Sequence, residues 1–375
     1  MITKLKIILT RIIKSTFRFV PIDKELIVMI HKGNSGSNLN PIINSNAFKQ
    51  FKSLIIGGNY NRNTFLNKMK SYIFINRAKL ILTTHGPLQK PKKNQVNFDL
   101  WHGFPLKGMH YMDHNEYIIK DKFNATYILS TSNLFNTFMN ACIAENISKY
   151  KVLGYPRNDY LFKSDGINNL NLLIENSTKF NKIILFMPTW RRSNLDNVEG
   201  RKKDNLFTFS DFESIEFNNF LVENNYLLVM KFHPNEEKIM LENFSEEVKS
   251  NMKIISNDAL NSKNMDIYEV VNSTDLLITD YSSIYFDYLL IDKPIIFINS
   301  DIDSYKVSRG LLVENYDDWT PGFKVDNSKD LSKAIKKALN EDPHVLDRQK
   351  LLNKIHRYQD GNSTDRVVEF IKKII

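Results

Sequence analysis

Residues 275–299 constrain the fold more than any other stretch, because they read as one strand–turn–helix–strand unit. Residues 276–278 form a short apolar run of the length expected for a strand buried on both faces. The turn at residues 279–283, T-D-Y-S-S, is rich in hydroxyl groups. Residues 284–291 then fit a helix, and residues 295–298 form a second apolar strand. This order predicts a βαβ unit and therefore a parallel sheet.

The polar turn of this unit is predicted to lie at the carboxyl end of a parallel strand, where open α/β sheets bind their ligands. Free backbone N–H groups at a helix N-terminus, joined by the hydroxyl groups of Ser282 and Ser283, can bind an anion without any metal. We interpret the turn as a phosphate site. The alternative is that the two serines only cap a helix, and this stretch alone does not decide between them.

Short apolar runs alternate with helical patterns along the rest of the chain, and 375 residues are enough for two α/β domains. We expect residues 21–165 to form an N-terminal domain and residues 180–375 a C-terminal domain, with a polar linker between them. The last helix, at residues 363–373, follows the second domain in sequence, and packing against the first domain is an alternative placement for it. The predicted strands are residues 26–30, 53–56, 79–83, 98–102, 127–132, a short strand from residue 151 to the turn at Gly154, and residues 182–186, 226–231, 253–256, 276–278 and 295–298.

Two histidines stand near the ends of predicted strands. His102 lies where Gly103 and Pro105 break a strand, and Lys107 adds positive charge nearby. An unperturbed histidine has a pKa of about 6.5 and suits general-base work near neutral pH. The competing interpretation is a structural histidine that hydrogen-bonds a loop, which is the commoner role of a single histidine. His233 ends another strand in the sequence K-F-H-P-N.

The formal net charge of +9 indicates an anionic partner. Three classes of partner fit this charge: nucleic acid, an anionic membrane surface and a phosphorylated substrate. The single cysteine, Cys142, excludes a disulfide framework within the chain and fits a reducing cytoplasm. The sequence contains no zinc-ligand spacing, no P-loop and no interleaved basic and aromatic RNA-binding motif. We therefore expect a cytoplasmic protein with no metal-ligand set, whose anionic partner is not nucleic acid.

Residues 1–20 are apolar but carry five cations, too many for a transmembrane span, and they lack the cleavage site of a signal peptide. A basic helix of this kind can lie in the headgroup region of an anionic leaflet. We favour this over an ordinary first helix packed on its own domain, because five cations are unusual on a core helix. The segment predicts peripheral attachment to the inner face of the cell membrane.

Five motifs, taken in order, resemble the CDP-glycerol glycerophosphotransferases of teichoic acid synthesis. They are L-W-H-G-F-P-L-K from residue 100, G-Y-P-R-N-D from 154, P-T-W-R-R from 188, K-F-H-P-N from 231 and T-D-Y-S-S-I-Y-F-D from 279. The closing D-G-N-S-T-D-R-V-V, from residue 360, is also similar. The resemblance runs from about Lys79 to the last residue. It implies a GT-B architecture, in which two Rossmann-like domains face one another across a cleft and the second holds most of the CDP.

The resemblance also implies roles for single residues. His102 matches the family's proposed base, and His233 matches a histidine that faces the donor diphosphate. Phe104 departs from the small hydroxyl residue that is common at its position, which leaves the acceptor side less defined. The implied donor-binding residues are Arg191, Asn235, Thr279, Asp280, Ser282, Ser283 and Asp287, and those of the acceptor or cleft are Gly103, Lys107, Arg157 and Asp159.

In the implied reaction an acceptor hydroxyl group attacks the β-phosphorus of the donor and CMP leaves, so the protein mainly positions groups and neutralises charge. We predict transfer of glycerol phosphate, or a related polyol phosphate, from a CDP-activated donor to a teichoic acid, a capsule-like polymer or its lipid-linked primer. No permanently bound cofactor is implied, and metal dependence is left open.

The alternative is a GT-B glycosyltransferase that uses a nucleotide-sugar for cell-surface polysaccharide. A nucleic-acid-binding module is a weaker alternative, because the candidate residues fall at strand ends where ligands bind.

Overall fold

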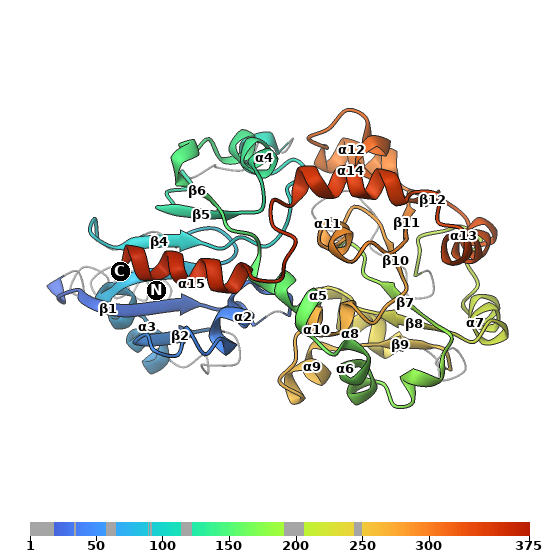
Figure 1. Ribbon diagram of the computed structural model, residues 1–375, viewed down its shortest axis with the longest axis horizontal. Coiled ribbons are helices and arrows are strands. Elements are labelled where there is room, and N and C mark those ends of the chain that lie inside the picture. Colours follow the sequence, from blue (N-terminus) through green and yellow to red (C-terminus); the bar gives the residue numbers. More distant parts are fainter. Residues whose placement is uncertain are drawn as a thin grey trace, which may run out of the picture.

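The computed structural model describes residues 19–33, 35–57, 65–88, 90, 92–113, 122–190, 206–243 and 250–375. Its strands form two six-stranded sheets, one in each half of the chain (Figure 1). The first has the order β2-β1-β3-β4-β5-β6 and the second β12-β11-β10-β7-β8-β9, and all the pairings within them are parallel. The predicted α/β class with parallel sheets is confirmed.

The elements that build each half follow the chain order. The first half contains β1 (Asp23–Ile30), α2 (Leu39–Asn44), β2 (Ser53–Ile56), α3 (Phe65–Arg77), β3 (Ala78–Thr83), β4 (Val96–Asp99), β5 (Tyr127–Ser130), α4 (Asn133–Ile143), β6 (Tyr150–Val152) and α5 (Asp159–Lys163). The second contains α6 (Gly166–Leu173), β7 (Lys182–Phe186), α7 (Ser214–Glu223), β8 (Tyr226–Met230), α8 (Pro234–Asn243), β9 (Met252–Ile254), α9 (Asn257–Ser262), α10 (Tyr268–Val271), β10 (Leu276–Thr279), α11 (Ile284–Tyr288), β11 (Ile295–Ile298), α12 (Ile302–Arg309), β12 (Phe323–Val325), α13 (Ser328–Asn340) and α14 (Val345–Ile355). The last helix is α15 (Ser363–Ile374).

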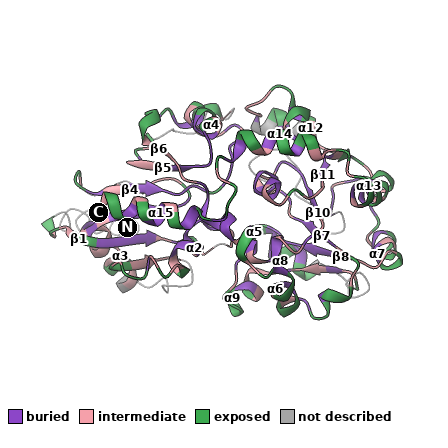
Figure 2. Cartoon of the chain, viewed as in Figure 1, coloured by how far each residue is buried: buried purple, intermediate pink, exposed green. Residues whose placement is uncertain are grey.

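The predicted βαβ unit is present. Strand β10 lies inside the second sheet between β7 and β11, and all its residues are buried, which explains its continuous apolar sequence. Helix α11 continues into a 3-10 turn at Leu289–Ile291 and leads to β11. Figure 2 shows that the strands of both sheets are largely buried, whereas the helices are exposed on their outer sides.

Residues 166–179, expected to be a polar linker, instead form α6 and a 3-10 turn, and α6 packs on α10. The Asp165 side chain caps α6 by accepting a hydrogen bond from the Asn168 amide, and Leu170 is fully buried. Gly166 lies so close to Asn272 that an added Cβ would meet its side-chain oxygen at 1.9 Å. The segment joins β6 of the first sheet to β7 of the second, and its Asn-rich composition does not reveal that it contains a helix.

Helix α14 lies over the second half, and the chain then crosses back so that α15 covers one face of the first sheet (Figure 1). The Phe370 ring contacts the rings of Phe98 and Tyr127, with centroids 5.4 and 5.1 Å away. The second half thus returns a helix to the first, and the two halves are joined by more than one crossing of the chain. No helix in the described ranges is long and apolar enough to span a membrane. The predicted membrane-surface helix lies almost entirely in residues 1–18, outside the described residues.

Candidate active site

A cavity of about 360 Å³ lies between the two halves. Its walls come from segments that follow β1, β3, β4 and β6 in the first sheet and β7, β8, β9 and β10 in the second. Parallel strands carry their carboxyl ends to one edge of a sheet, and here the two such edges face the same cavity. Among the described residues, the lining includes four cationic residues and no aspartate or glutamate. The cationic residues are Lys32, Lys107, Arg157 and Lys231.

His102 lines this cavity from the loop after β4. The strand ends at Asp99, three residues earlier than predicted, because Trp101 has a φ of 52° and cannot continue it. The Asp99 carboxylate accepts hydrogen bonds from the Trp101 amide at 2.9 Å and from the Thr83 hydroxyl at 2.6 Å. Burial raises the pKa of Asp99 to about 6. This buried turn fixes the position of His102.

The His102 ring has a defined tautomer. Its Nδ1 atom lies 2.9 Å from the carbonyl oxygen of Thr84. A carbonyl oxygen only accepts, so Nδ1 carries the proton and Nε2 keeps its lone pair. Desolvation by the surrounding protein, and next the neighbouring His85, lower the pKa of His102 to about 3, although the residue is still exposed to solvent on the cavity side. The ring is therefore neutral near pH 7, with Nε2 able to accept a proton.

His85 is a cavity residue that sequence reasoning missed. Its ring stacks on the His102 ring, with centroids 4.3 Å apart and planes 10° apart. Burial, and then the charges of Lys32 and Arg157, lower the pKa of His85 to about 4. The signal was present, because T-H-G follows β3 as directly as W-H-G follows β4.

His233 lines the opposite wall, and its ring stacks on Trp190 with centroids 5.0 Å apart. The Asn235 amide donates to His233 Nδ1 at 3.3 Å, so in the neutral ring Nε2 carries the proton. Burial, and then the charges of Lys231 and Lys107, lower the pKa of His233. The two histidines thus have opposite tautomers, and Nε2 is an acceptor on one wall and a donor on the other.

Ser282 and Ser283 also line the cavity. Ser283 occupies the N-cap position of α11, but its side chain makes no capping hydrogen bond, so the helix-cap alternative fails for this serine. Its hydroxyl group lies against the first half: a Cβ added to Gly103 would be 2.4 Å from Ser283 Oγ. Only glycine at position 103 permits this close approach of the W-H-G loop to the serine turn.

Thr279 and Asp280, predicted to contact a donor, are buried and do not line the cavity. Thr279 Oγ1 donates to the Met187 carbonyl oxygen at 2.8 Å, and the Thr189 amide donates to Asp280 Oδ1 at 2.6 Å. Both side chains therefore hold the loop that carries Trp190 into the cavity.

Asp287 likewise does not line the cavity, because its carboxylate is used in a buried ion pair between the halves. Arg157 Nη2 lies 2.5 Å from Asp287 Oδ2. The Asn158 side-chain amide and the Tyr268 hydroxyl also donate to this carboxylate, at 3.0 and 2.7 Å. Arg157 Nη1 donates to the carbonyl oxygens of Gly36 and His102, at 3.0 and 2.7 Å. This guanidinium thus links the backbone of the His102 loop to the second half.

The structure brings some of the predicted site residues together at the 360 Å³ cavity and places others elsewhere. His102, Lys107, Arg157, His233, Ser282 and Ser283 line the cavity, and Gly103 contacts it through Ser283. Asp159 lies elsewhere and caps α15 by accepting from the amides of Ser363 and Thr364 at 2.8 and 2.7 Å. The Asn235 side chain is exposed and outside the lining, and Arg191 lies outside the described residues. Lys32, Ser35, Ser37, His85, Trp190 and Lys231 are lining residues that sequence reasoning did not select.

The cavity offers hydroxyl, imidazole and cationic groups, a set that suits a diphosphate and a nearby proton transfer. In the described ranges, no three His, Cys, Asp or Glu side chains gather in a group that could hold a metal ion.

Residues 47–373 match the family described as CDP-Glycerol:Poly(glycerophosphate) glycerophosphotransferase. The chain belongs to this family. The resemblance indicated by the five motifs is therefore confirmed. The match covers nearly all of the second half and the first half from residue 47 onward, and β1 and α2 lie before it.

Among curated relatives of this glycerophosphotransferase-family chain, the teichoic acid poly(glycerol phosphate) polymerase of Bacillus subtilis (strain 168) is 26% identical over 310 residues. That match covers 78% of this chain but only 39% of the relative, so the chain spans well under half of its length. The teichoic acid glycerol-phosphate transferase of Staphylococcus aureus (strain NCTC 8325 / PS 47) is 26% identical over 331 residues, which is 81% of this chain and 79% of that one.

A solved structure of the wall teichoic acid polymerase TagF superposes with a TM-score of 0.74, covering 99% of this chain and 96% of that chain. The sequences are 20% identical, so this likeness concerns the fold. Together with the two parallel sheets, it confirms the predicted GT-B architecture of the family member.

Proposed function

We propose that this chain transfers glycerol phosphate, or a closely related polyol phosphate, from a CDP-activated donor to a hydroxyl group of a teichoic acid polymer or its lipid-linked primer. The observation that carries the proposal is the cavity between the halves. Its described lining residues include four cations and no carboxylate, and it has one histidine of each tautomer on opposite walls. Membership of the family supports the donor class. One solved structure is of a TagF variant with CDPG after a soak, which supports the same class.

The reaction is an in-line displacement at the β-phosphorus of the donor. The acceptor oxygen forms a bond to this phosphorus while the bond to the α-phosphate oxygen breaks, and CMP leaves with that electron pair. Nε2 of His102 accepts the proton of the attacking hydroxyl group. Nε2–H of His233 donates to the diphosphate, where negative charge develops on the leaving CMP.

Charge neutralisation falls to Lys32 and Lys107 from the first half and to the hydroxyl groups of Ser282 and Ser283 from the second. Lys231 is paired with Glu237 at 2.8 Å, and Arg157 is paired with Asp287, so these two cations chiefly hold the walls in place. Contact between Gly103 and Ser283 brings the two walls together and limits the entry of water, which would compete with the acceptor.

The nucleotide product tests the proposal. The protein is incubated with CDP-glycerol and a glycerol phosphate oligomer, and nucleotides are separated chromatographically. We expect CMP in proportion to the transferred glycerol phosphate. Production of CDP or UDP from nucleotide-sugars instead would indicate sugar transfer, and no nucleotide product from any CDP-polyol would refute the proposed activity. CDP-ribitol is the second donor to try, because a teichoic acid ribitol-phosphate polymerase of Staphylococcus aureus is 30% identical over 219 residues.

Replacing both cavity serines, as Ser282→Ala with Ser283→Ala, is expected to weaken CDP binding. Each lost hydrogen bond to a charged phosphate costs about 1.5–3 kcal/mol, which is at least tenfold in affinity. Isothermal calorimetry with CDP measures the change. The matched control is Ser262→Ala with Ser332→Ala, two serines outside the cavity lining, and equal affinity in both double variants would remove the serine turn from the donor site.

We also propose that residues 1–20 attach the protein to an anionic membrane surface. Their cations and apolar side chains suit an anionic leaflet, on which a lipid-linked acceptor would lie. Deleting them is expected to abolish sedimentation with anionic vesicles while leaving turnover of a soluble oligomer largely intact. Undiminished sedimentation of the truncated protein would show that another surface makes the contact.

A further inference from the structure

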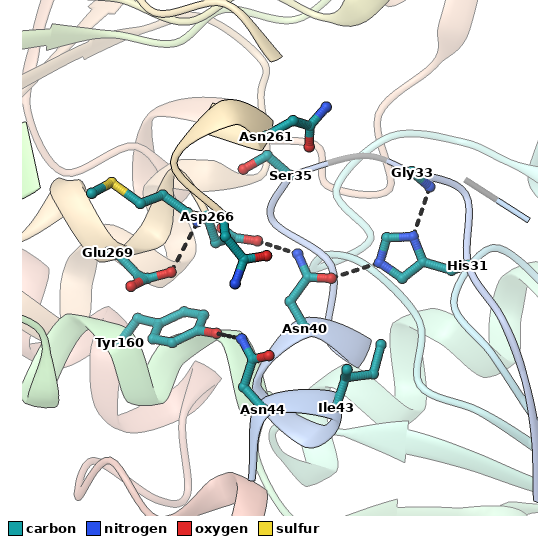
Figure 3. Close-up of a pocket in the computed structure, with 12 residues that line it drawn as sticks. His31, Gly33, Ser35, Asn40, Ile43, Asn44, Tyr160, Asn261, Asp266 and Glu269 are labelled. Carbon is teal, nitrogen blue, oxygen red and sulfur yellow. Dashed lines mark hydrogen bonds between the residues drawn. The ribbon is translucent and has the colours of Figure 1, made fainter. Parts of the chain in front are cut away.

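A second cavity, of about 220 Å³, lies between the halves beside the first (Figure 3). The segment from the end of β1 through α2 forms one wall, and the segment from α9 to α10 forms the other. Asp266 and Glu269 line it, and none of its described lining residues is a lysine or arginine, which is the reverse of the 360 Å³ cavity. Ser35 lines both cavities, so they adjoin at this residue.

A hydrogen-bond chain fixes the walls of the 220 Å³ cavity. The Gly33 amide donates to His31 Nδ1 at 2.8 Å, so Nε2 of the neutral ring donates to Asn40 Oδ1 at 2.6 Å. Asn40 Nδ2 donates in turn to Asp266 Oδ2 at 2.5 Å, and the Gly36 amide also donates to this carboxylate. Figure 3 shows this chain crossing from the first half to the second. The cavity is therefore built before any ligand enters.

Other lining groups keep their hydrogen-bonding capacity. The side-chain amides of Asn261 and Asn264 make no hydrogen bond to the part of the chain that the structure describes. The Tyr160 hydroxyl accepts from Asn44 at 3.3 Å and has its own proton left to donate, since burial raises the pKa of Tyr160 and keeps it protonated. Glu269 lines the cavity and uses Oε1 to accept from the Asp266 amide, and its Oε2 accepts no hydrogen bond from the described residues.

We propose that this cavity binds a polyol unit of the substrate through its hydroxyl groups, an inference that rests on the proposed function. Amide, phenol and carboxylate groups pair with both the donor and the acceptor side of a hydroxyl group, whereas two carboxylates without a cation repel phosphate. Ile43 and Met265 give the carbon chain of a polyol an apolar contact. A polyol phosphate polymer alternates anionic and neutral hydroxylated units, and the adjoining cavities offer a cationic site followed by a neutral and acidic one.

The test removes the two free amides without disturbing the fixed chain, as Asn261→Ala with Asn264→Gly. Asn264 has a φ of 53°, which glycine adopts without strain. The matched control is Asn133→Ala with Asn176→Gly, because Asn133 is exposed on a helix and Asn176 has a φ of 58°, and neither lines a cavity between the halves. Calorimetry measures the affinities of CDP, CDP-glycerol and a synthetic glycerol phosphate oligomer for the wild type and both variants.

We expect the Asn261 and Asn264 variant to lose about tenfold in oligomer affinity, the size of one or two neutral hydrogen bonds, with CDP affinity unchanged. Loss of CDP-glycerol affinity with unchanged oligomer affinity would assign the cavity to the polyol of the donor, which also supports a polyol site. The proposal is overturned if all three affinities match those of the control, if CDP affinity falls as well, or if the wild type binds neither polyol ligand. Binding is measured without turnover, so a failure of the proposed activity remains distinguishable through the CMP assay.

Discussion

Replacing Asp287 by alanine is expected to lower the free energy of unfolding by about 3–5 kcal/mol, the usual consequence of breaking a buried ion pair. The change leaves the Arg157 guanidinium, which is 5% exposed, without its counter-ion. It also removes the acceptor for Asn158 and Tyr268. Urea denaturation followed by circular dichroism measures the shift in the transition midpoint.

Two control variants distinguish the destabilisation caused by leaving Arg157 as an unpaired buried charge from the destabilisation caused by lost contacts alone. Asp347→Ala, which breaks an exposed ion pair with Lys350, should leave the midpoint almost unchanged. Arg157→Met combined with Asp287→Leu should be more stable than Asp287→Ala, because no unpaired charge remains buried. Equal midpoints for Asp287→Ala and Asp347→Ala would mean that this ion pair does not hold the halves together.

The strand ends could be predicted from the sequence because buried parallel strands leave short apolar runs followed by polar turns. This pattern placed His102, His233, Ser282 and Ser283 correctly at one cavity, although the strand before His102 ends earlier than its apolar residues suggest. The helix at residues 166–173 was missed because its apolar face consists of few residues within an Asn-rich segment.

The roles of Asp287 and Asp159 could not be predicted, because their partners lie far away in the sequence. Asp287 pairs with Arg157, 130 residues before it, and Asp159 caps a helix that begins 204 residues after it. Both carboxylates fall in motifs of the family, so a ligand-binding role was the natural expectation. The 220 Å³ cavity is equally invisible in the sequence, since it forms only where residues near 40 meet residues near 266.

Replacing His102 by alanine is expected to lower turnover by about 10²–10⁴-fold, the range for a general base. CDP affinity should change little, because His102 lies on the first half and the serine turn lies on the second. The control is His344→Ala, a histidine outside the lining of both cavities. A correctly folded His102→Ala protein that keeps more than about a tenth of wild-type turnover would remove this residue from the chemical step.

The pH dependence adds a sharper test of the same residue. An unperturbed histidine would begin to lose activity as a base near pH 6.5, but the pKa of His102 in the free protein is lowered to about 3. Protonation removes the Nε2 lone pair, so the acid limb of kcat/KM that is due to His102 should lie below pH 6.5. The bound diphosphate adds negative charge beside the ring and favours the protonated form, so the acid limb of kcat should lie at higher pH than that of kcat/KM. A kcat/KM limb near pH 6.5 that disappears in His102→Ala would show that the ring is better solvated than its stacking on His85 implies.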